Sequence, residues 1–222
     1  TPICMGDSLL LDHGLPNVSS VWDHGKNTNP IWVTTAGTYR VTVTNSNNCV
    51  DTVSVSLVVK NPPSFTLPSD TSLCEGESYT LGTGLNAVTH THQWSGGSVL
   101  TTSDILVTSS GEYRVDVTEV STMCVSSDTV TFTFLDVPSV DLGLDTNLCS
   151  GEDLSLSSPD TDFSLYSIAW STGSQSLSIN VDTSGLYWLE AANGLCLSRD
   201  SINVLFYDNP VSLLQEDLIL CF

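Results

Sequence analysis

Ile105-Leu106-Val107-Thr108-Ser109-Ser110-Gly111-Glu112-Tyr113 is the most informative stretch of the chain, because its pattern occurs three times. The shared pattern is Ile-x-Val-x-x-x-Gly-x-Tyr, and the other copies cover residues 31–39 and 179–187. Alternating apolar residues are typical of strands, and the glycine between them is typical of a turn. Each copy therefore predicts the end of one strand, a tight turn and the start of the next strand.

The same landmarks surround each copy of this motif. A cysteine opens each unit, at Cys4, Cys74, Cys149 and again at Cys221, with a period of 70 to 75 residues. Three openings read Cys-x-Gly-acid, and three openings are preceded by Asp-x-x-Leu. A Trp-x-x-Gly follows 18 to 21 residues after each complete opening. Repetition of this kind predicts an array of similar modules.

Composition and turn spacing predict an all-β fold of tandem immunoglobulin-like β-sandwiches. β-Branched residues are abundant, short alternating runs are common, and turn residues punctuate them at short intervals. About seven strands are expected in each module, as in sandwiches of this type. In the second module we expect a first strand at 64–67 and a short extra strand at 98–100.

Proline-containing linkers mark the predicted module boundaries. They are only a few residues long, so they predict stiff junctions and an extended rod. The first repeat is expected to lack its first strand because the sequence begins at Thr1, and we expect the natural chain to continue past Phe222. The predicted division is repeat 1 at 1–61, repeat 2 at 62–137, repeat 3 at 138–209 and the start of a truncated fourth repeat at 210–222.

Tryptophan and tyrosine at repeated positions are the predicted core. A module of about 70 residues buries a small core, for which a tryptophan between the sheets is a natural filler. Each motif tyrosine lies two residues after the turn glycine, as in a tyrosine corner. The glycine itself predicts a backbone conformation that is costly for other residues. The predicted core residues are Trp22, Trp94, Trp170, Tyr39, Tyr113 and Tyr187.

Seven cysteines indicate an oxidising compartment and disulfide bonds. Zinc is disfavoured because the chain has no Cys-x-x-Cys pair. Two cysteines per complete module favour pairing within each module. That arrangement gives Cys4–Cys49, Cys74–Cys124 and Cys149–Cys196, with Cys221 bonded beyond the sequence.

A geometric argument opposes this pairing. In an immunoglobulin-like topology the two cysteines of one module lie at opposite ends of strands that span roughly 20 Å, whereas a disulfide tolerates a Cα separation of about 7 Å. The rival arrangement clamps neighbouring modules together through Cys4–Cys124 and Cys74–Cys196. Both arrangements remain open at the level of sequence.

Together these motifs resemble the tandem immunoglobulin-like repeats of Bacteroidota cell-surface proteins, including gliding-motility adhesins and other proteins of type IX secretion. Phrases such as Trp170-Ser171-Thr172-Gly173-Ser174 and Leu142-Gly143-Leu144-Asp145 are similar to that family, and the resemblance covers essentially the whole chain. It implies export across the outer membrane and an extracellular location at the cell surface.

The resemblance also implies a glycosylation signal, Asp-Ser/Thr followed by an apolar residue. The alternative is that Asp-Thr simply begins a strand. The candidate O-glycosylation positions are Ser8, Thr52, Thr129 and Ser201.

The charge balance excludes some partners. With 5 basic and 25 acidic residues, the formal net charge is −20, so nucleic acid is excluded as a natural partner and a bare anionic membrane is disfavoured. No segment reaches the roughly 18 apolar residues that a membrane-spanning helix needs, so membrane insertion is not expected.

The sequence offers few candidates for chemistry. His90-x-His92 has the spacing of two ligands on one strand face, although a structural role is favoured. No catalytic triad order, nucleophile elbow or phosphate loop occurs, so we expect no catalysis, no metal and no cofactor. Structural calcium is the one ion hypothesis. Its candidate ligands are Asp70, Asp145, Asp160 and Asp162.

The leading hypothesis is a structural stalk segment of a long extracellular filament or adhesin. Its partners would be neighbouring repeats of the same chain, lateral copies that pair through edge strands, and an adhesion ligand that the sequence does not identify. The alternative is a carbohydrate-binding accessory array of a secreted enzyme, with Trp32 and Trp188 as its solvent-facing aromatics.

Overall fold

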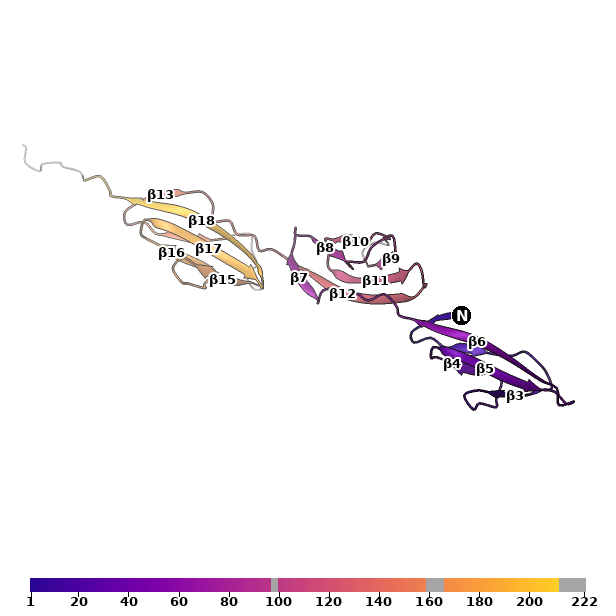
Figure 1. Cartoon of the computed structure of the whole chain (residues 1–222). Coiled ribbons are helices and arrows are strands. Elements are labelled where there is room, and N and C mark those ends of the chain that lie inside the picture. Colours follow the sequence, from indigo (N-terminus) through magenta and orange to yellow (C-terminus); the bar gives the residue numbers. More distant parts are fainter. Residues whose placement is uncertain (97–99, 159–165, 212–222) are drawn as a thin grey trace, which may run out of the picture. The chain divides into compact units, whose positions relative to one another are not determined.

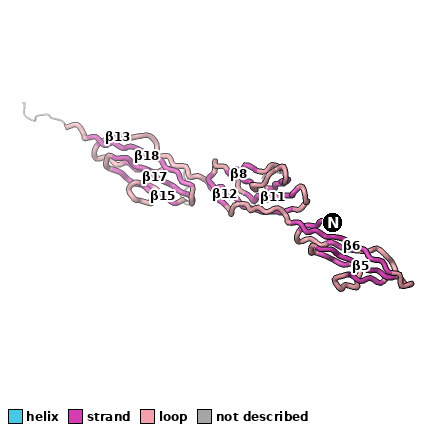
Figure 2. Tube along the Cα trace, viewed as in Figure 1, coloured by secondary structure: helices cyan, strands magenta, loops and turns pink. Residues whose placement is uncertain are grey.

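The protein is described by a computed structural model, which covers residues 1–96, 100–158 and 166–211. All regular structure in these residues is β-strand (Figure 1, Figure 2). This described part contains no helix long and apolar enough to cross a membrane. The strands form three sets of six, which we call the first, second and third modules.

The strands of all three modules follow one order along the chain. The first module comprises β1 (Pro2–Cys4), β2 (Leu9–Leu11), β3 (Ser19–Trp22), β4 (Ile31–Val33), β5 (Gly37–Thr44) and β6 (Val50–Lys60). The second comprises β7 (Thr71–Cys74), β8 (Tyr79–Gly82), β9 (His90–Ser95), β10 (Asp104–Val107), β11 (Gly111–Glu119) and β12 (Val125–Leu135). The third comprises β13 (Thr146–Cys149), β14 (Leu154–Ser157), β15 (Ser167–Trp170), β16 (Ser178–Val181), β17 (Gly185–Asn193) and β18 (Cys196–Tyr207).

Each module contains a four-stranded and a two-stranded sheet. The four-stranded sheets have the orders β1-β6-β5-β3, β7-β12-β11-β9 and β13-β18-β17-β15. The two-stranded sheets are β2-β4, β8-β10 and β14-β16. In the first and third modules the first strand runs parallel to the last, and the other pairs are antiparallel. This topology confirms the prediction of tandem all-β, immunoglobulin-like modules.

The strand inventory differs from the prediction at the start of the modules. Residues 64–67 do not form a strand, so the described residues of the second module contain six strands rather than about seven. The first module opens with β1, which takes the place of β7 and β13, and the prediction that it lacks a counterpart of 64–67 stays a prediction. Within the extra strand expected at 98–100, only Leu100 lies in the described residues, where it forms an isolated bridge with Trp94.

The repeated tryptophans lie in the module cores. Trp22, Trp94 and Trp170 are 4%, 0% and 1% exposed. Burial would leave the indole N–H without water, and each Nε1 donates instead to a backbone carbonyl oxygen at 2.8–3.1 Å. In the third module Trp170 packs with Leu142 and Leu189, among others.

The corner motif carries the chain from one sheet to the other, as between β10 and β11. Each motif tyrosine donates its hydroxyl to the carbonyl oxygen four residues earlier, at 2.9 Å in every module. The acceptors for Tyr39, Tyr113 and Tyr187 are Thr35, Ser109 and Thr183. The hydrogen bond ties the turn to the strand that follows it.

The prediction that the corner glycine adopts a special backbone conformation is wrong for Gly37 and Gly185. Neither has a positive φ, because each begins an extended strand. The glycine of the Cys-x-Gly-acid turn has that role instead, with φ of 88° at Gly76.

By its contacts the chain divides into two compact units. One consists of Thr1–Thr71 with Ser78–Phe132, and the other of Ser72–Glu77 with Thr133–Phe222. Each unit contains one of the two disulfides described below.

Candidate functional site

Each module opens with the same cysteine turn. In the second module the amide of Cys74 donates to Glu77 Oε2 at 2.8 Å, and the amide of Glu77 donates back to the carbonyl oxygen of Cys74 at 3.0 Å. Cys4 with Asp7, and Cys149 with Glu152, make the same two contacts. The Cys-x-Gly-acid pattern is therefore a structural turn that presents a cysteine at the end of the first strand.

The second cysteine of each module lies at the hairpin between the last two strands. Cys124 follows Met123, which has a φ of 61°, and its carbonyl oxygen accepts the amide of Glu119 at 3.0 Å. Cys196 pairs across its hairpin with Asn193. Both of these cysteines are 1% exposed.

Two disulfides join these turns and hairpins between modules. Cys4 is bonded to Cys124 with a Cα–Cα distance of 5.6 Å, and Cys74 is bonded to Cys196 with a distance of 5.5 Å. Each bond therefore links the opening turn of one module to the hairpin of the next, and we call this unit a clamp. Cys49 and Cys149 carry free, exposed thiols, whereas Cys221 lies outside the described residues.

The within-module pairing that the cysteine count favoured is therefore wrong for Cys4–Cys49, Cys74–Cys124 and Cys149–Cys196. In the first module Cys4 pairs in register with Lys60, at the end of β6, whereas Cys49 directly precedes the start of β6. The 11 residues of β6 span about 35 Å at roughly 3.3 Å per residue. A disulfide cannot bridge that distance.

A hydrogen bond accompanies the second clamp, where Asn193 Nδ2 donates to the carbonyl oxygen of Asp136 at 3.2 Å. In the hairpin of the first clamp, hydrogen bonds from Ser121 and Thr122 lower the pKa of Glu119, and the positive charges of His90 and Lys60 lower it further. Lys60 is the in-register neighbour of Cys4. The second hairpin is thus held to the end of the preceding module by a hydrogen bond as well as by the disulfide.

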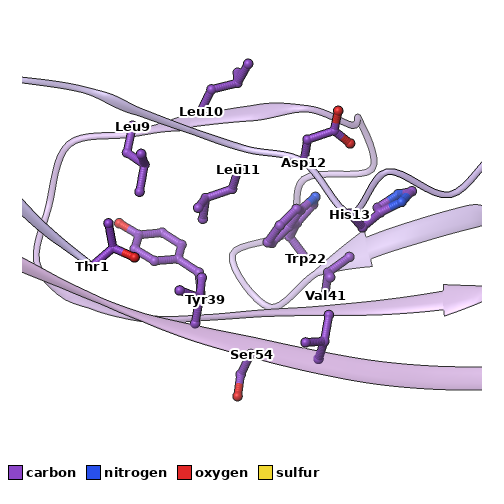
Figure 3. A pocket seen from close by; sticks show the side chains of 12 residues that line it. Thr1, Leu9, Leu10, Leu11, Asp12, His13, Trp22, Tyr39, Val41 and Ser54 are labelled. Carbon is purple, nitrogen blue, oxygen red and sulfur yellow. The ribbon is translucent and has the colours of Figure 1, made fainter.

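A groove of about 350 Å³ opens between the two sheets of the first module (Figure 3). Leu9 and Leu11 point toward the rings of Tyr39 and Trp22, whereas Leu10 points away. The groove also exposes part of the last strand, where Val53 is 57% exposed. Its counterparts in the strand register, Asp128 and Asp200, are half-buried.

In the other modules a segment before the opening cysteine lies against this part of the last strand. The amide of Leu67 donates to Asp128 Oδ2 at 2.8 Å, and the amide of Leu142 donates to Asp200 Oδ2 at 2.7 Å. Leu142 is itself 8% exposed and belongs to the core of the third module. The segments before Cys74 and Cys149 are therefore parts of the sandwiches as well as links between modules.

The calcium candidates take part in the same arrangement. Asp70 accepts the amide of Thr131 at 2.8 Å, and Asp145 accepts the amide of Asn203 at 2.9 Å. These hydrogen bonds explain the Asp-x-x-Leu-Cys pattern without an ion. The other two candidates, Asp160 and Asp162, lie outside the described residues.

The two strand histidines do not converge on a shared site. His92 is 3% exposed, and its Nε2 lies 2.9 Å from Thr83 Oγ1, whereas His90 Nδ1 lies 2.9 Å from Thr89 Oγ1. Burial lowers the pKa of His92, and the neighbouring His90 lowers it further. Within the ranges that the structure describes, no group of three or more His, Cys, Asp or Glu side chains could hold a metal ion.

The candidate glycosylation positions share an exposed surface location. Asp51 and Asp128 accept the amides of the following Thr52 and Thr129 at 2.8 Å, so the Asp-Thr pattern also has a structural reason. Modification remains a prediction. Ser8, Thr52, Thr129 and Ser201 are all exposed.

The two candidate aromatics for carbohydrate binding do not form one platform. Trp32 is 67% exposed on β4 of a two-stranded sheet. Trp188 is half-buried on β17 of a four-stranded sheet, and the guanidinium carbon of Arg199 lies 3.8 Å from its ring centroid. These two residues therefore do not support the carbohydrate-binding alternative.

No family model and no curated protein matches the chain. Solved structures of tandem immunoglobulin domains are similar to it at low identity. Domains 3–5 of the Drosophila OTK extracellular region are 12% identical over 93% of this chain and 94% of that chain, with a TM-score of 0.44. The I67–I69 fragment of the titin I-band is 15% identical over 93% and 95%, also with a TM-score of 0.44. The insect immune protein hemolin is 14% identical over 93% and 73%, with a TM-score of 0.43. The fold assignment here depends on the strand topology described above.

Proposed function

We propose that this chain is a structural segment of a long extracellular filament or adhesin, in which clamped immunoglobulin-like modules form a stiff rod. The observation that carries the proposal is the clamp, which occurs twice with the same pairing of turn and hairpin. A covalent bond between neighbouring modules suits a protein that must keep its modules in line outside the cell.

The chemistry of the surface supports the same role. A formal net charge of −20 keeps an elongated protein soluble and apart from polyanions. The repeated polar residues that were candidates for ion or metal binding make structural hydrogen bonds. The repeated residues of the described modules thus serve folding and linkage, which fits projection or adhesion without catalysis.

The proposal also includes a narrower class of surface protein. We place the protein among the type IX-secreted surface proteins of Bacteroidota, of the gliding-motility adhesin type, on the sequence motifs given above. The repeat boundaries at 61–62, 137–138 and 209–210, lateral self-assembly through edge strands, and O-glycosylation at the exposed Asp-Ser/Thr positions are parts of this proposal.

Electron microscopy of producing cells, with an antibody against this chain, tests the location. We expect gold label along filaments that project from the cell surface, and loss of label after the antibody is adsorbed with purified chain. Label found only in the culture medium would contradict the proposal.

Removal of a clamp tests its mechanical role. In the Cys4→Ser, Cys124→Ser double variant we expect faster proteolysis between the first two modules, because the hairpin of the second module is released. Cys49→Ser is the matched control for this junction, since it removes a cysteine of the same hairpin type that has no part in the Cys4–Cys124 bond. Equal proteolysis of the double variant and the control would show that the clamp does not hold the junction.

A further inference from the structure

Cys49 and Cys149 are placed like the cysteines that form the clamps. We call Cys4, Cys74 and Cys149 the opening cysteines, and Cys49, Cys124 and Cys196 the hairpin cysteines. Both disulfides pair one opening cysteine with the hairpin cysteine of the next module. Among the residues that the structure describes, the opening cysteine Cys149 and the hairpin cysteine Cys49 are therefore left without a complementary partner.

The surroundings of Cys149 match those of its bonded counterpart Cys74. The amide of Cys149 donates to Glu152 Oε2 at 2.8 Å, the distance found between Cys74 and Glu77. The next amide, that of Ser150, donates to the carbonyl oxygen of Tyr207 at 2.8 Å, as Glu75 donates to Leu135 at 2.9 Å. Cys149 is thus presented by the same turn on the same strand pair as a cysteine that is disulfide-bonded.

Cys49 matches its bonded counterpart Cys124. The residue before it, Asn48, has a φ of 61°, which is also the φ of Met123. The carbonyl oxygen of Cys49 accepts the amide of Asn45 at 3.1 Å, as that of Cys124 accepts the amide of Glu119 at 3.0 Å. The bonded hairpin cysteines are 1% exposed, whereas Cys49 is exposed.

The groove of the first module leaves part of its last strand accessible. In the second module the corresponding surface contacts the segment at 62–70, which leads to that module's own opening cysteine. In the first module Val53 takes the register position of Asp128 and is 57% exposed, so this surface is open to an extended segment.

From these observations we propose that Cys49 and Cys149 are halves of two further clamps, each taking the complementary cysteine of another immunoglobulin-like module. Cys149 takes a hairpin cysteine, and Cys49 takes an opening cysteine. The inference rests on the proposed function, because it takes the partner to be another module of the proposed array of clamped modules. The partner module belongs either to the same polypeptide or to a second copy of this chain, in which Cys149 of one copy bonds Cys49 of the next.

Bond formation needs an oxidant, which we identify as a small-molecule disulfide such as oxidised glutathione. The first protein thiolate displaces one glutathione thiolate and forms a mixed disulfide, and the second protein thiolate then displaces the other. Two protein thiols and one oxidised glutathione become one protein disulfide and two reduced glutathione molecules, which carry the two protons.

The first experiment addresses a second copy as the partner. The 222-residue chain, with Cys221→Ser to remove the third thiol, is oxidised with glutathione and digested without reduction. We expect a ladder of covalent oligomers and an interchain Cys49–Cys149 peptide. Cys49→Ser or Cys149→Ser should each abolish the ladder while the Cys4–Cys124 and Cys74–Cys196 peptides remain, which shows that the fold is retained.

The second experiment addresses the same polypeptide. Protein isolated from producing cells is alkylated and digested without reduction, and we expect peptides that join Cys49 to an opening cysteine and Cys149 to a hairpin cysteine of other modules. A complementary pairing in either experiment supports the proposal and identifies the source. Free thiols, Cys149–Cys149 pairing or an intrachain Cys49–Cys149 bond in both experiments would overturn it. Surface labelling by microscopy is independent of these results, so failure of the clamps is distinguishable from failure of the proposed location.

Discussion

The first and second modules share their strand order, the tyrosine corner and the core tryptophan. Only in the second module does another segment cover the inner surface of the last strand. Val53 is 57% exposed, whereas Asp128, which takes the same register position in the second module, is half-buried. The second module has residues 62–70 against this surface, held by Asp128 and Asp70. The difference shows that residues 62–70, for which the sequence predicts a linker and a strand, form an irregular part of the sandwich that completes its core.

The largest expected difference concerns the last-strand valine that pairs with the motif tyrosine, which is Val130 in the second module and Val55 in the first. Val130 is 1% exposed, so Val130→Ala should lower the free energy of opening of the second module by about 2–3 kcal/mol, because it removes buried apolar volume. Val55 is only half-buried, so Val55→Ala is the matched control and should lower the stability of the first module by about 1 kcal/mol or less. Hydrogen exchange of peptides from β11 and β12, compared with β5 and β6, measures both. Equal losses in the two modules would contradict the comparison.

The next largest effect concerns the aspartate that holds the segment. Asp128→Ala should destabilise the second module by about 2 kcal/mol, because the amides of Leu67 and Thr129 both lose their acceptor. Asp51→Ala removes an acceptor from Thr52 alone and should cost less. The exchange rate of the Leu67 amide is the specific measurement. An unchanged rate in Asp128→Ala would show that the segment is held by other contacts.

The tyrosine corner should not distinguish the modules. Tyr39→Phe and Tyr113→Phe each remove one hydrogen bond of 2.9 Å from a buried side chain, so each should cost about 1 kcal/mol. Hydrogen exchange in β5 and β11 provides the comparison. A much smaller loss in the first module would mean that its open groove already loosens the corner.

The smallest expected effect depends on pH. Burial lowers the pKa of His92, so the unfolded chain binds a proton more readily than the folded module. Stability of the second module should therefore fall as the pH drops below about 6.5, the ordinary pKa of histidine. The first module has Ser20 at this position and lacks this contribution. His92→Gln should reduce the pH dependence of exchange in β9 and β11, and an unchanged dependence would assign it to other groups.

Sequence periodicity was sufficient for the fold because the core is built from residues that repeat at fixed places. Trp94 and Tyr113 are nearly enclosed, and alternation along β11 places Val115 and Val117 in the same core. An alternation with a period of two shows which face of a strand is buried, and it can be recognised in the sequence of that strand alone.

The clamps were harder to predict because pairing between modules leaves no spacing signal within one module. Equal numbers of cysteines per module fit both arrangements, and the length of β6 was needed to exclude Cys4–Cys49. The sequence also does not identify the irregular segments at 62–70 and 138–145 as parts of the core, because they lack the sustained alternation that identifies a strand. Their alternation is broken by Pro68 and Gly143, although the aspartates that hold them precede a threonine or serine in every copy.

The overlap of the two clamps has a consequence for damage and load. Cys4–Cys124 encloses a separation of 120 residues and Cys74–Cys196 one of 122, and the two loops share the residues from Cys74 to Cys124. A single cut of the backbone anywhere between Cys4 and Cys196 therefore leaves two pieces that are still covalently joined. When the ends of the chain are pulled, a disulfide carries the force past the residues of the loop that it closes. Unfolding of those residues therefore does not lengthen the path through the disulfide. A chain cross-linked in this way resists both a protease and a pull with the same two bonds.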